Sequence, residues 1–343
     1  MKKYLALLLV LVMVLSLAAC ASKPTETTDE PEQTTPVPAP AEETKDEEPA
    51  PAEETKEEEP TEEPADNTEY AVAMITDYGD ITDQSFNQTT YEACKAFCEE
   101  KGIDFNYFKP AGDSDAERVA MIESSIDEGY NVVVMPGYAF AGAIKETAGT
   151  YSDVTFIALD VGAGDLGDDY QLPSNLYCAV YQEELCGYMA GYAAVKLGYK
   201  NLGFLGGMAV PAVVRYGYGF VQGVDAAAAA LGLTDVKLNY IYGGQFYGDS
   251  DITAVMDTWY TNGTEVVFAC GGGIYTSAVE AALKSNGYVV GVDVDQNYIG
   301  VNGVADGSFA YNPFITSAMK GLTEAVNTAL SDIEAGDWSN IAA

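Results

Sequence analysis

The chain has 343 residues and a formal net charge of −37, with 53 acidic residues, 16 basic residues and no histidine. This length, about twice the ~150 residues of one domain, predicts a two-lobed protein or two domains. The acidity disfavours nucleic acid, anionic lipid headgroups and multiply phosphorylated ligands as partners. The lack of histidine excludes a Ser-His-Asp triad, a Cys-His pair and a His-ligated zinc. Arg118 and Arg215 are the only arginines, so bidentate binding of a carboxylate or phosphate ligand by arginine is scarcely available. A neutral ligand or acid–base chemistry by carboxylates remains.

The first 20 residues have the pattern of an export signal. Lys2 and Lys3 precede an apolar run over residues 4–17, which ends in Leu-Ala-Ala-Cys at Cys20. The run falls short of the ~20 residues that span a bilayer, so a secretory signal is favoured over a transmembrane anchor. The Leu-Ala-Ala-Cys ending resembles the lipobox of bacterial lipoproteins. It predicts that Cys20 is acylated and tethers the mature protein to the extracytoplasmic face of the cell membrane.

Residues 21–69 are of low complexity and contain 18 Asp or Glu residues and 9 of the 14 prolines. They hold too few apolar side chains to offset the entropy of an ordered chain. We therefore expect a disordered acidic linker between the membrane and a domain over residues 70–343.

From residue 70 onward, apolar runs typical of strands alternate with stretches of helical spacing. The predicted strands cover residues 71–76, 105–108, 131–135, 154–159, 201–205, 236–242, 265–270 and 288–292. The predicted helices cover residues 84–101, 116–128, 140–150, 183–197, 213–231, 251–262, 274–285 and 314–333. Strands joined through single helices form parallel sheets by right-handed crossovers. The pattern predicts an α/β protein of two doubly wound lobes, the first near residues 70–178 plus part of the C-terminal segment, the second near 179–295.

Several predicted strands end in carboxylates or glycines. Asp77, Asp160 and Asp293 follow apolar strands, and a glycine run at residues 271–273 follows another. In parallel sheets, ligands bind at the carboxyl ends of the strands. These residues therefore predict an acidic rim facing a cleft between the lobes. For Asp83 we favour a different role, which is to cap the following helix.

Seven segments of the chain resemble, in the same order, the basic membrane protein (BMP) family of lipoproteins. The proteins of this family are the purine nucleoside receptors of ATP-binding cassette (ABC) transporters. The first segment is TDYGDITDQSFNQ at residues 76–88, and the second is Leu159-Asp160. The others are residues 182–194, 206–224, 242–246, 268–282 with 290–296, and ITSAMK at 315–320. The resemblance implies a type I periplasmic-binding-protein-like fold, a role in binding rather than catalysis, no cofactor and no metal, and permease subunits as partners.

The resemblance also implies a ligand site. Phe86 and Phe246 would stack on the two faces of a purine base. Asn87, whose amide has both a donor and an acceptor, would hydrogen-bond the edge of the base. Asp77, Asp160 and Asp293 would accept hydrogen bonds from the ligand, and Lys320 would donate one to a ribose oxygen. Ser85 is predicted to belong to the same ligand site. Gly271 and Gly272 would let the ligand approach the backbone closely. A neutral nucleoside fits this acidic site better than a nucleotide does.

Two other functions remain open. A sugar receptor of the ribose-binding type shares the fold and uses stacking and carboxylates, although such sites also use arginine. A nucleoside hydrolase could use Asp77, Asp160 and Asp293 with calcium. Where the family commonly has lysine, this chain has Gln84, which we interpret as a surface difference. Cys94 and Cys98 are interpreted as buried apolar residues, and a disulfide among the remaining cysteines stays possible.

Overall fold

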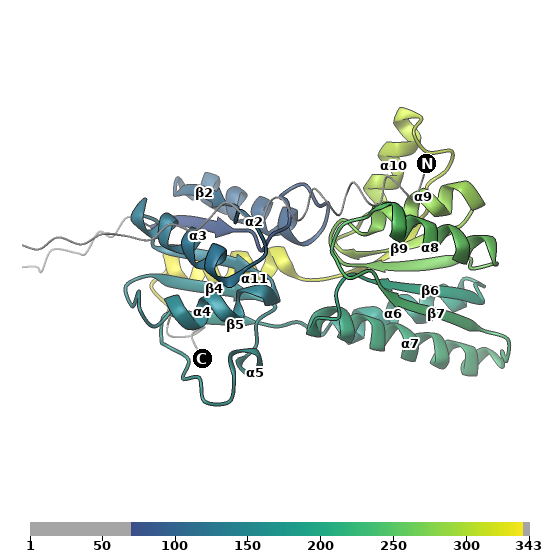
Figure 1. The fold of residues 1–343 in the computed structure, drawn as a ribbon, viewed down its shortest axis with the longest axis horizontal. Helices are drawn as coiled ribbons and strands as arrows, with labels where there is room; N and C mark the ends of the chain where they lie inside the picture. The colour runs from purple at the N-terminus through teal and green to yellow at the C-terminus, as the bar shows by residue number, and fades with distance from the viewer. Residues whose placement is uncertain (1–69, 339–343) are drawn as a thin grey trace, which may run out of the picture. The chain divides into compact units, whose positions relative to one another are not determined.

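The computed structural model describes residues 70–338, which form two five-stranded sheets, each wholly parallel (Figure 1). The strand orders are β2-β1-β3-β4-β5 and β10-β9-β8-β6-β7. Read in reverse, the second order is β7-β6-β8-β9-β10, which has the same pattern as the first. The strands β4 and β9 therefore occupy equivalent places in the two sheets. The predicted fold of two doubly wound parallel lobes is confirmed. The predicted signal, the acylated Cys20 and the linker over residues 21–69 lie outside the described residues.

The first sheet has helices on both faces because its strands alternate their buried side chains. Val132 and Val134 face α2 and α11, while Val133 and Met135 face α3 and α4. The strands are β1 (Ala71–Ile75), β2 (Asp104–Phe108), β3 (Val132–Pro136), β4 (Thr155–Leu159) and β5 (Leu176–Ala179). The helices are α2 (Phe86–Lys101), α3 (Asp115–Asp127), α4 (Ala141–Thr147), α5 (Ala163–Leu166) and α11 (Leu322–Glu334).

The second sheet follows the same plan. Phe204 and Phe268 pack against α6 and α7, and Leu205 and Val267 pack against α8 and α9. The strands are β6 (Asn201–Gly206), β7 (Lys237–Tyr242), β8 (Val266–Cys270), β9 (Tyr288–Asp293) and β10 (Phe314–Met319). The helices are α6 (Glu183–Lys196), α7 (Pro211–Leu231), α8 (Ser250–Thr261), α9 (Tyr275–Ser285) and α10 (Asn297–Asp306).

The C-terminal segment differs from its prediction. A single helix was predicted over residues 314–333, but the chain forms β10 and then, after Lys320 and Gly321, α11. Pairing with β9 supplies β10 with its backbone hydrogen bonds, and helical spacing cannot reveal such a long-range partner. The second lobe therefore extends through β10 instead of ending near residue 295. The short edge strand β5 and the helix α10 were also missed.

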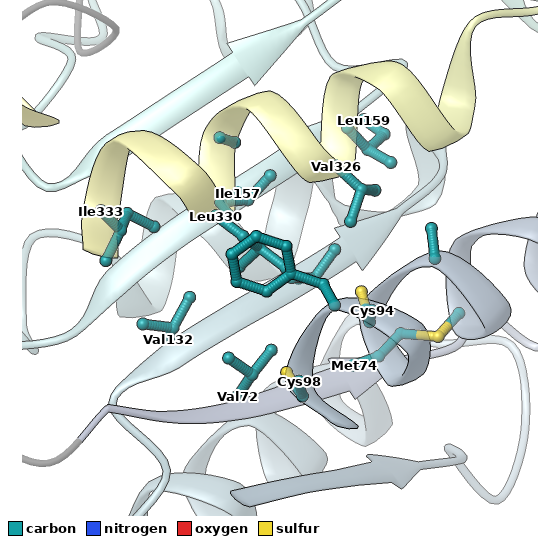
Figure 2. Packing of buried hydrophobic residues seen from close by; sticks show 14 of the residues in the cluster. Val72, Met74, Cys94, Cys98, Val132, Ile157, Leu159, Val326, Leu330 and Ile333 are labelled. Carbon is teal, nitrogen blue, oxygen red and sulfur yellow. The ribbon is translucent and has the colours of Figure 1, made fainter. Parts of the chain in front are cut away.

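After β10 the chain returns to the first lobe through α11. Figure 2 shows Val326, Leu330 and Ile333 of α11 packed over the first sheet beside Cys94 and Cys98 of α2. Both cysteines are buried, as predicted, and the five cysteines among residues 70–338 are all free. The chain thus passes between the lobes at residues 180–182 and again at Lys320 and Gly321.

None of the helices in the described part of the chain combines the length and the apolar character that a membrane span requires.

Candidate functional site

A cavity of about 380 Å³ opens at the carboxyl ends of both sheets and is lined by residues of both lobes. This volume lies within the roughly 300–1,000 Å³ that is typical of small-molecule pockets. Nine of the ten predicted site residues line the cavity: Asp77, Phe86, Asn87, Asp160, Phe246, Gly271, Gly272, Asp293 and Lys320. The rim predicted from the strand ends is therefore a real concave surface.

Asp160 and Asp293 hold equivalent positions in the two lobes. Asp160 follows β4 and Asp293 ends β9, and both have left-handed backbone conformations, with φ of 61° and 64°. Residues other than glycine adopt this region rarely and at an energetic cost, and such residues gather at functional sites. Each carboxyl group is thus held at the cavity by a backbone turn that the sheet alone does not require.

Lys320 contributes an ammonium group to the cavity from the second passage between the lobes. Its side chain is 2% exposed, and Nζ lies 2.7 Å from Asp160 Oδ2. Nζ also lies 4.9 Å from the centre of the Phe86 ring. Burial lowers the pKa of a lysine, but the carboxylates of Asp160, Asp293 and Glu183 outweigh burial here and raise it, so Lys320 stays charged.

Burial raises the pKa of Asp160, although the charge on Lys320 opposes that change. Asp160 Oδ1 is buried and has no hydrogen-bond partner among the described residues. An unpaired buried acceptor costs free energy unless a ligand or water supplies a donor. Asp160 therefore offers one oxygen to Lys320 and the other to a donor in the cavity.

The structure gives Ser85 a position different from that of the other predicted residues. It is fully buried, does not line the cavity, and donates from Oγ to Asp293 Oδ2 at 2.6 Å. Ser85 belongs to the first lobe and Asp293 to the second, so this hydrogen bond joins the lobes beneath the cavity. Burial raises the pKa of Asp293, while Lys320 and the Ser85 hydroxyl oppose the rise.

Asn87 is oriented by two carboxylates. Its Nδ2 lies 3.3 Å from Asp77 Oδ1 and 3.2 Å from Asp83 Oδ2. Because ionised carboxylates only accept hydrogen bonds, both contacts assign the amide nitrogen to that side. Asn87 Oδ1 is then left buried without a partner among residues 70–338. Asn87 therefore presents an acceptor to the cavity, not the donor and acceptor expected from its side chain alone.

Asp83 caps α2, as predicted, although it lies two residues before the helix-flanking Ser85. Its carboxylate accepts hydrogen bonds from the backbone N–H groups of Ser85, Asn87 and Gln88. Burial nevertheless raises the pKa of Asp83 to about 6. The same carboxylate thus fixes the start of the helix and the orientation of Asn87.

The two phenylalanines reach the cavity from different lobes, Phe86 at the start of α2 and Phe246 in the loop after β7. The glycines beside Phe246 also accommodate its ring. A Cβ atom on Gly271 would lie 2.7 Å from the Phe246 ring, and one on Gly207 would lie closer still. Gly207 and Gly271 thus make room for the ring. Close approach of a ligand to the backbone of Gly271 and Gly272, which line the cavity, stays a prediction.

Tyr78 was not identified from the sequence, although it lies within the first motif. Its ring stacks on Phe246 with centroids 6.3 Å apart, and its hydroxyl lies 3.8 Å from Met208 Sδ of the other lobe. Its position directly after Asp77 was the available signal, because a residue beside a strand-end carboxylate shares the rim.

Gln84, which was interpreted as a surface difference, is half-buried and also contacts the second lobe. Gln84 has a left-handed backbone, with φ of 57°. Its carbonyl accepts a hydrogen bond from Gln296 Nε2 at 3.0 Å, and its Oε1 accepts one from the Tyr298 hydroxyl at 2.6 Å. Gln296 is fully buried, and both partners belong to the second lobe. Gln84 therefore joins the lobes at the edge of the cavity.

The three strand-end carboxylates do not form a metal site. Within residues 70–338, no group of three or more Asp, Glu or Cys side chains has a geometry that could hold a metal ion. Asp77 is instead bonded to the N–H groups of Tyr78 and Gly79, each at 2.7 Å. These two bonds hold the Asp77 carboxylate against the backbone that follows it.

The chain is similar in sequence to one family of known proteins and similar in fold to several solved structures. The model of a family described as the PnrA-like ABC transporter substrate-binding proteins (Bmp) matches residues 70–341. An "ABC transporter nucleoside-binding protein BmpA" from Lactococcus lactis is 27% identical over 279 residues, 78% of this chain and 74% of the relative. "Basic membrane protein A1" from Borrelia garinii is 27% identical over 264 residues, 76% of this chain and 72% of the relative.

Among solved structures, an ABC transporter solute-binding protein from Aeropyrum pernix superposes with a TM-score of 0.67 at 20% identity. The match covers 78% of this chain and 71% of that protein. At this identity the likeness concerns the fold, and it agrees with the two parallel-sheet lobes described above.

Proposed function

Because the chain belongs to the Bmp family of ABC transporter substrate-binding proteins, we propose that its cavity captures a neutral nucleoside, with purine nucleosides preferred, for import. Proteins of this class act on the extracytoplasmic side, bind a small molecule and deliver it to permease subunits. What we propose beyond this class assignment is that the ligand is a nucleoside. The name of the Lactococcus relative, which includes nucleoside binding, is consistent with it.

One observation carries the proposal: aromatic rings from both lobes line the same cavity as buried oxygen atoms that can accept hydrogen bonds. Phe86 and Phe246 offer flat apolar faces, which suit a heterocyclic base. Asn87 Oδ1 and Asp160 Oδ1 are unpaired acceptors. A nucleoside supplies the matching donors from its base N–H groups and ribose hydroxyls. Nucleosides therefore complement both the shape and the hydrogen-bonding character of this cavity.

Electrostatics favours a nucleoside over a nucleotide. Asp77, Asp160 and Asp293 line the cavity, and the ammonium of Lys320 is already paired with Asp160. A phosphate group would meet carboxylates with little cationic compensation. The same acidic surroundings do not penalise an uncharged ligand.

Isothermal titration with inosine, guanosine and adenosine tests the proposal, with the 5′-monophosphates and ribose as comparisons. We expect heat from at least one purine nucleoside, weaker or no binding of its monophosphate, and no change when a chelator is added. Binding of ribose alone would favour the sugar receptor. Release of free base on incubation with inosine would favour a hydrolase.

We further propose that acylated Cys20 tethers the protein to the membrane through the linker over residues 21–69. The motif ending at Cys20 supports this proposal. The Cys20→Ala variant should be released or misprocessed, while its nucleoside affinity should stay unchanged because the cavity is formed by residues 77–320. A Cys20→Ala protein that stays firmly in the membrane fraction with its signal cleaved would contradict the lipid anchor.

A further inference from the structure

Lys320 has a second partner, which lies outside the cavity. Its Nζ is 3.1 Å from Glu183 Oε1, and the Glu183 side chain is fully buried. Glu183 is the first residue of α6 and follows the first passage between the lobes, whereas Lys320 lies in the second passage. This ion pair therefore links the start of α6, directly after the first passage, to the second passage.

Glu183 is in turn held by Arg215 of α7. Arg215 Nε donates to Glu183 Oε2 at 2.5 Å. Neither Glu183 nor Arg215 lines the cavity. Arg215 thus binds a carboxylate behind the site, and the charges alternate from Arg215 through Glu183 and Lys320 to Asp160.

Glu183 stays ionised although it is buried. Burial opposes its ionisation, but the hydrogen bond from Arg215 and the charge on Lys320 outweigh burial and hold the pKa of Glu183 below its usual value. Its place at the first turn of α6 adds the favourable field of a helix N-terminus. A permanent negative charge therefore lies behind the ammonium of Lys320.

This arrangement has a consequence for the ligand site. Without Glu183, the ammonium of Lys320 would be attracted only by cavity carboxylates, Asp160 in contact and Asp293 nearby. It would then move toward acceptors that a ligand needs and away from its position near the rings of Phe86, Tyr181 and Tyr216. Glu183 and Arg215 counterbalance that attraction.

We infer that Glu183, held by Arg215, is a positioning residue that fixes the Lys320 ammonium for hydrogen bonding to the ligand. The inference rests on the proposed function, because it assigns a role within nucleoside binding. It extends the site beyond the cavity to a pair of residues that the ligand never touches.

A double-mutant cycle tests the inference. Glu183→Gln keeps the size of the side chain and its ability to accept hydrogen bonds but removes the charge. Since hydrogen bonds to charged groups are among the stronger ones, we expect inosine affinity to fall about tenfold or more. In a Lys320→Met background, the same substitution should change affinity by less than about twofold, because the group it positions is gone. Glu184→Gln is the matched control, because it makes the same change on the same helix at a residue with no ion pair to Lys320.

Each outcome decides a different point. Equal losses from Glu183→Gln in both backgrounds, or no loss in either, would overturn the inference. If Glu183→Gln fails to fold, as its circular dichroism and melting curve would show, Arg215→Met replaces it. That variant should weaken inosine binding several-fold only when Lys320 is present, and an unchanged affinity would overturn the inference.

If the wild-type protein binds no nucleoside, the proposed function fails on its own. The same cycle, measured as denaturant midpoints, then still decides whether Glu183 acts through Lys320. Coupled shifts between the two substitutions would show that Glu183 holds Lys320 in place, and additive shifts would overturn the inference.

Discussion

At the scale of single residues, Phe86 and Phe246 give the sharpest test of the site. Stacking on a base is worth ~1–3 kcal/mol per ring, so Phe86→Ala and Phe246→Ala should each weaken nucleoside binding by roughly 10- to 100-fold. If both rings contact the same base, the double variant should lose less than the sum of the two losses. Replacement by leucine should keep part of the apolar contact and narrow the discrimination between purine and pyrimidine nucleosides.

Melting temperature, measured on the same proteins, provides the control for these variants. If the rings serve only to stabilise the fold, alanine variants will melt several degrees lower while the remaining folded protein keeps its affinity. Phe246 is the more informative of the two, because Gly207 and Gly271 leave space for its ring and Tyr78 stacks on it. A lowered melting temperature with unchanged affinity would remove both rings from the proposed site.

At the scale of elements, glycines bring α6 and α7 into direct backbone contact. A Cβ atom on Gly219 would lie 2.0 Å from the Glu184 carbonyl oxygen, and one on Gly191 would lie close to the Phe220 carbonyl oxygen. These helices carry Arg215 and Glu183, so their spacing also sets the geometry behind Lys320. The close contact is therefore a structural requirement with a link to the site.

We predict that Gly219→Ala destabilises the protein by about 1–3 kcal/mol, because the added methyl group has no room and the helices must move apart. Gly149→Ala is the control, since a Cβ atom there meets nothing within 4 Å. Chemical denaturation of both variants measures the effect. Equal stability of the two variants would show that the α6–α7 contact tolerates an extra methyl group.

At the scale of the whole molecule, the hydrogen bonds of Gln84 to Gln296 and Tyr298 hold the lobes together at the cavity edge. Ligand release from a two-lobed receptor requires the lobes to separate. Tyr298→Phe removes one of these bonds, worth ~1 kcal/mol, and should speed nucleoside release by a few-fold without a large change in melting temperature. Stopped-flow displacement of bound nucleoside measures the rate. An unchanged release rate would mean that this contact does not hold the closed state.

Lowering the pH should raise the thermal stability of the protein and weaken nucleoside binding. Burial raises the pKa values of Asp77, Asp160 and Asp293, and that of Asp83 to about 6. Groups with a raised pKa bind protons more tightly in the folded state, so their contribution to stability is complete at acid pH and is lost as the pH rises through the folded-state pKa. Relief of repulsion in this strongly negative chain acts in the same direction. The melting temperature should therefore rise from about pH 7.5 to about pH 5.

Nucleoside affinity should fall over the same range, because protonated carboxyls lose part of their capacity to accept hydrogen bonds. Calorimetry and titration at matched pH values check both trends. The exposed Asp235 has a pKa lowered by its hydrogen bond from Lys200, so Asp235→Asn should leave the acid-induced rise in melting temperature intact. Affinity that is independent of pH would contradict the role of these carboxylates.

The sequence by itself determined the features that depend on local patterns. Apolar runs marked eight of the ten strands. Six of these, β1, β3, β4, β6, β8 and β9, are buried, because an interior strand of a parallel sheet is covered on both faces. The rule that ligands bind at the carboxyl ends of such strands then brought Asp77, Asp160 and Asp293 together at one rim, as observed. Of the four edge strands, β2 and β7 were predicted and β5 and β10 were missed. β5 has only four residues, and β10 was assigned to a helix because its pairing with β9 is not visible in the local pattern.

Only the tertiary structure decided which partners the polar side chains choose. Ser85 bonds to Asp293 across 208 residues of sequence, Glu183 pairs with Lys320, and Gln84 bonds to Gln296 and Tyr298. No periodicity encodes such contacts, because they depend on how two separately folded sheets meet. The same holds for Asn87, whose amide could face either way until Asp77 and Asp83 were placed beside it. The sequence thus identified most of the residues at the cavity, and the packing of the lobes determined how each of them is oriented.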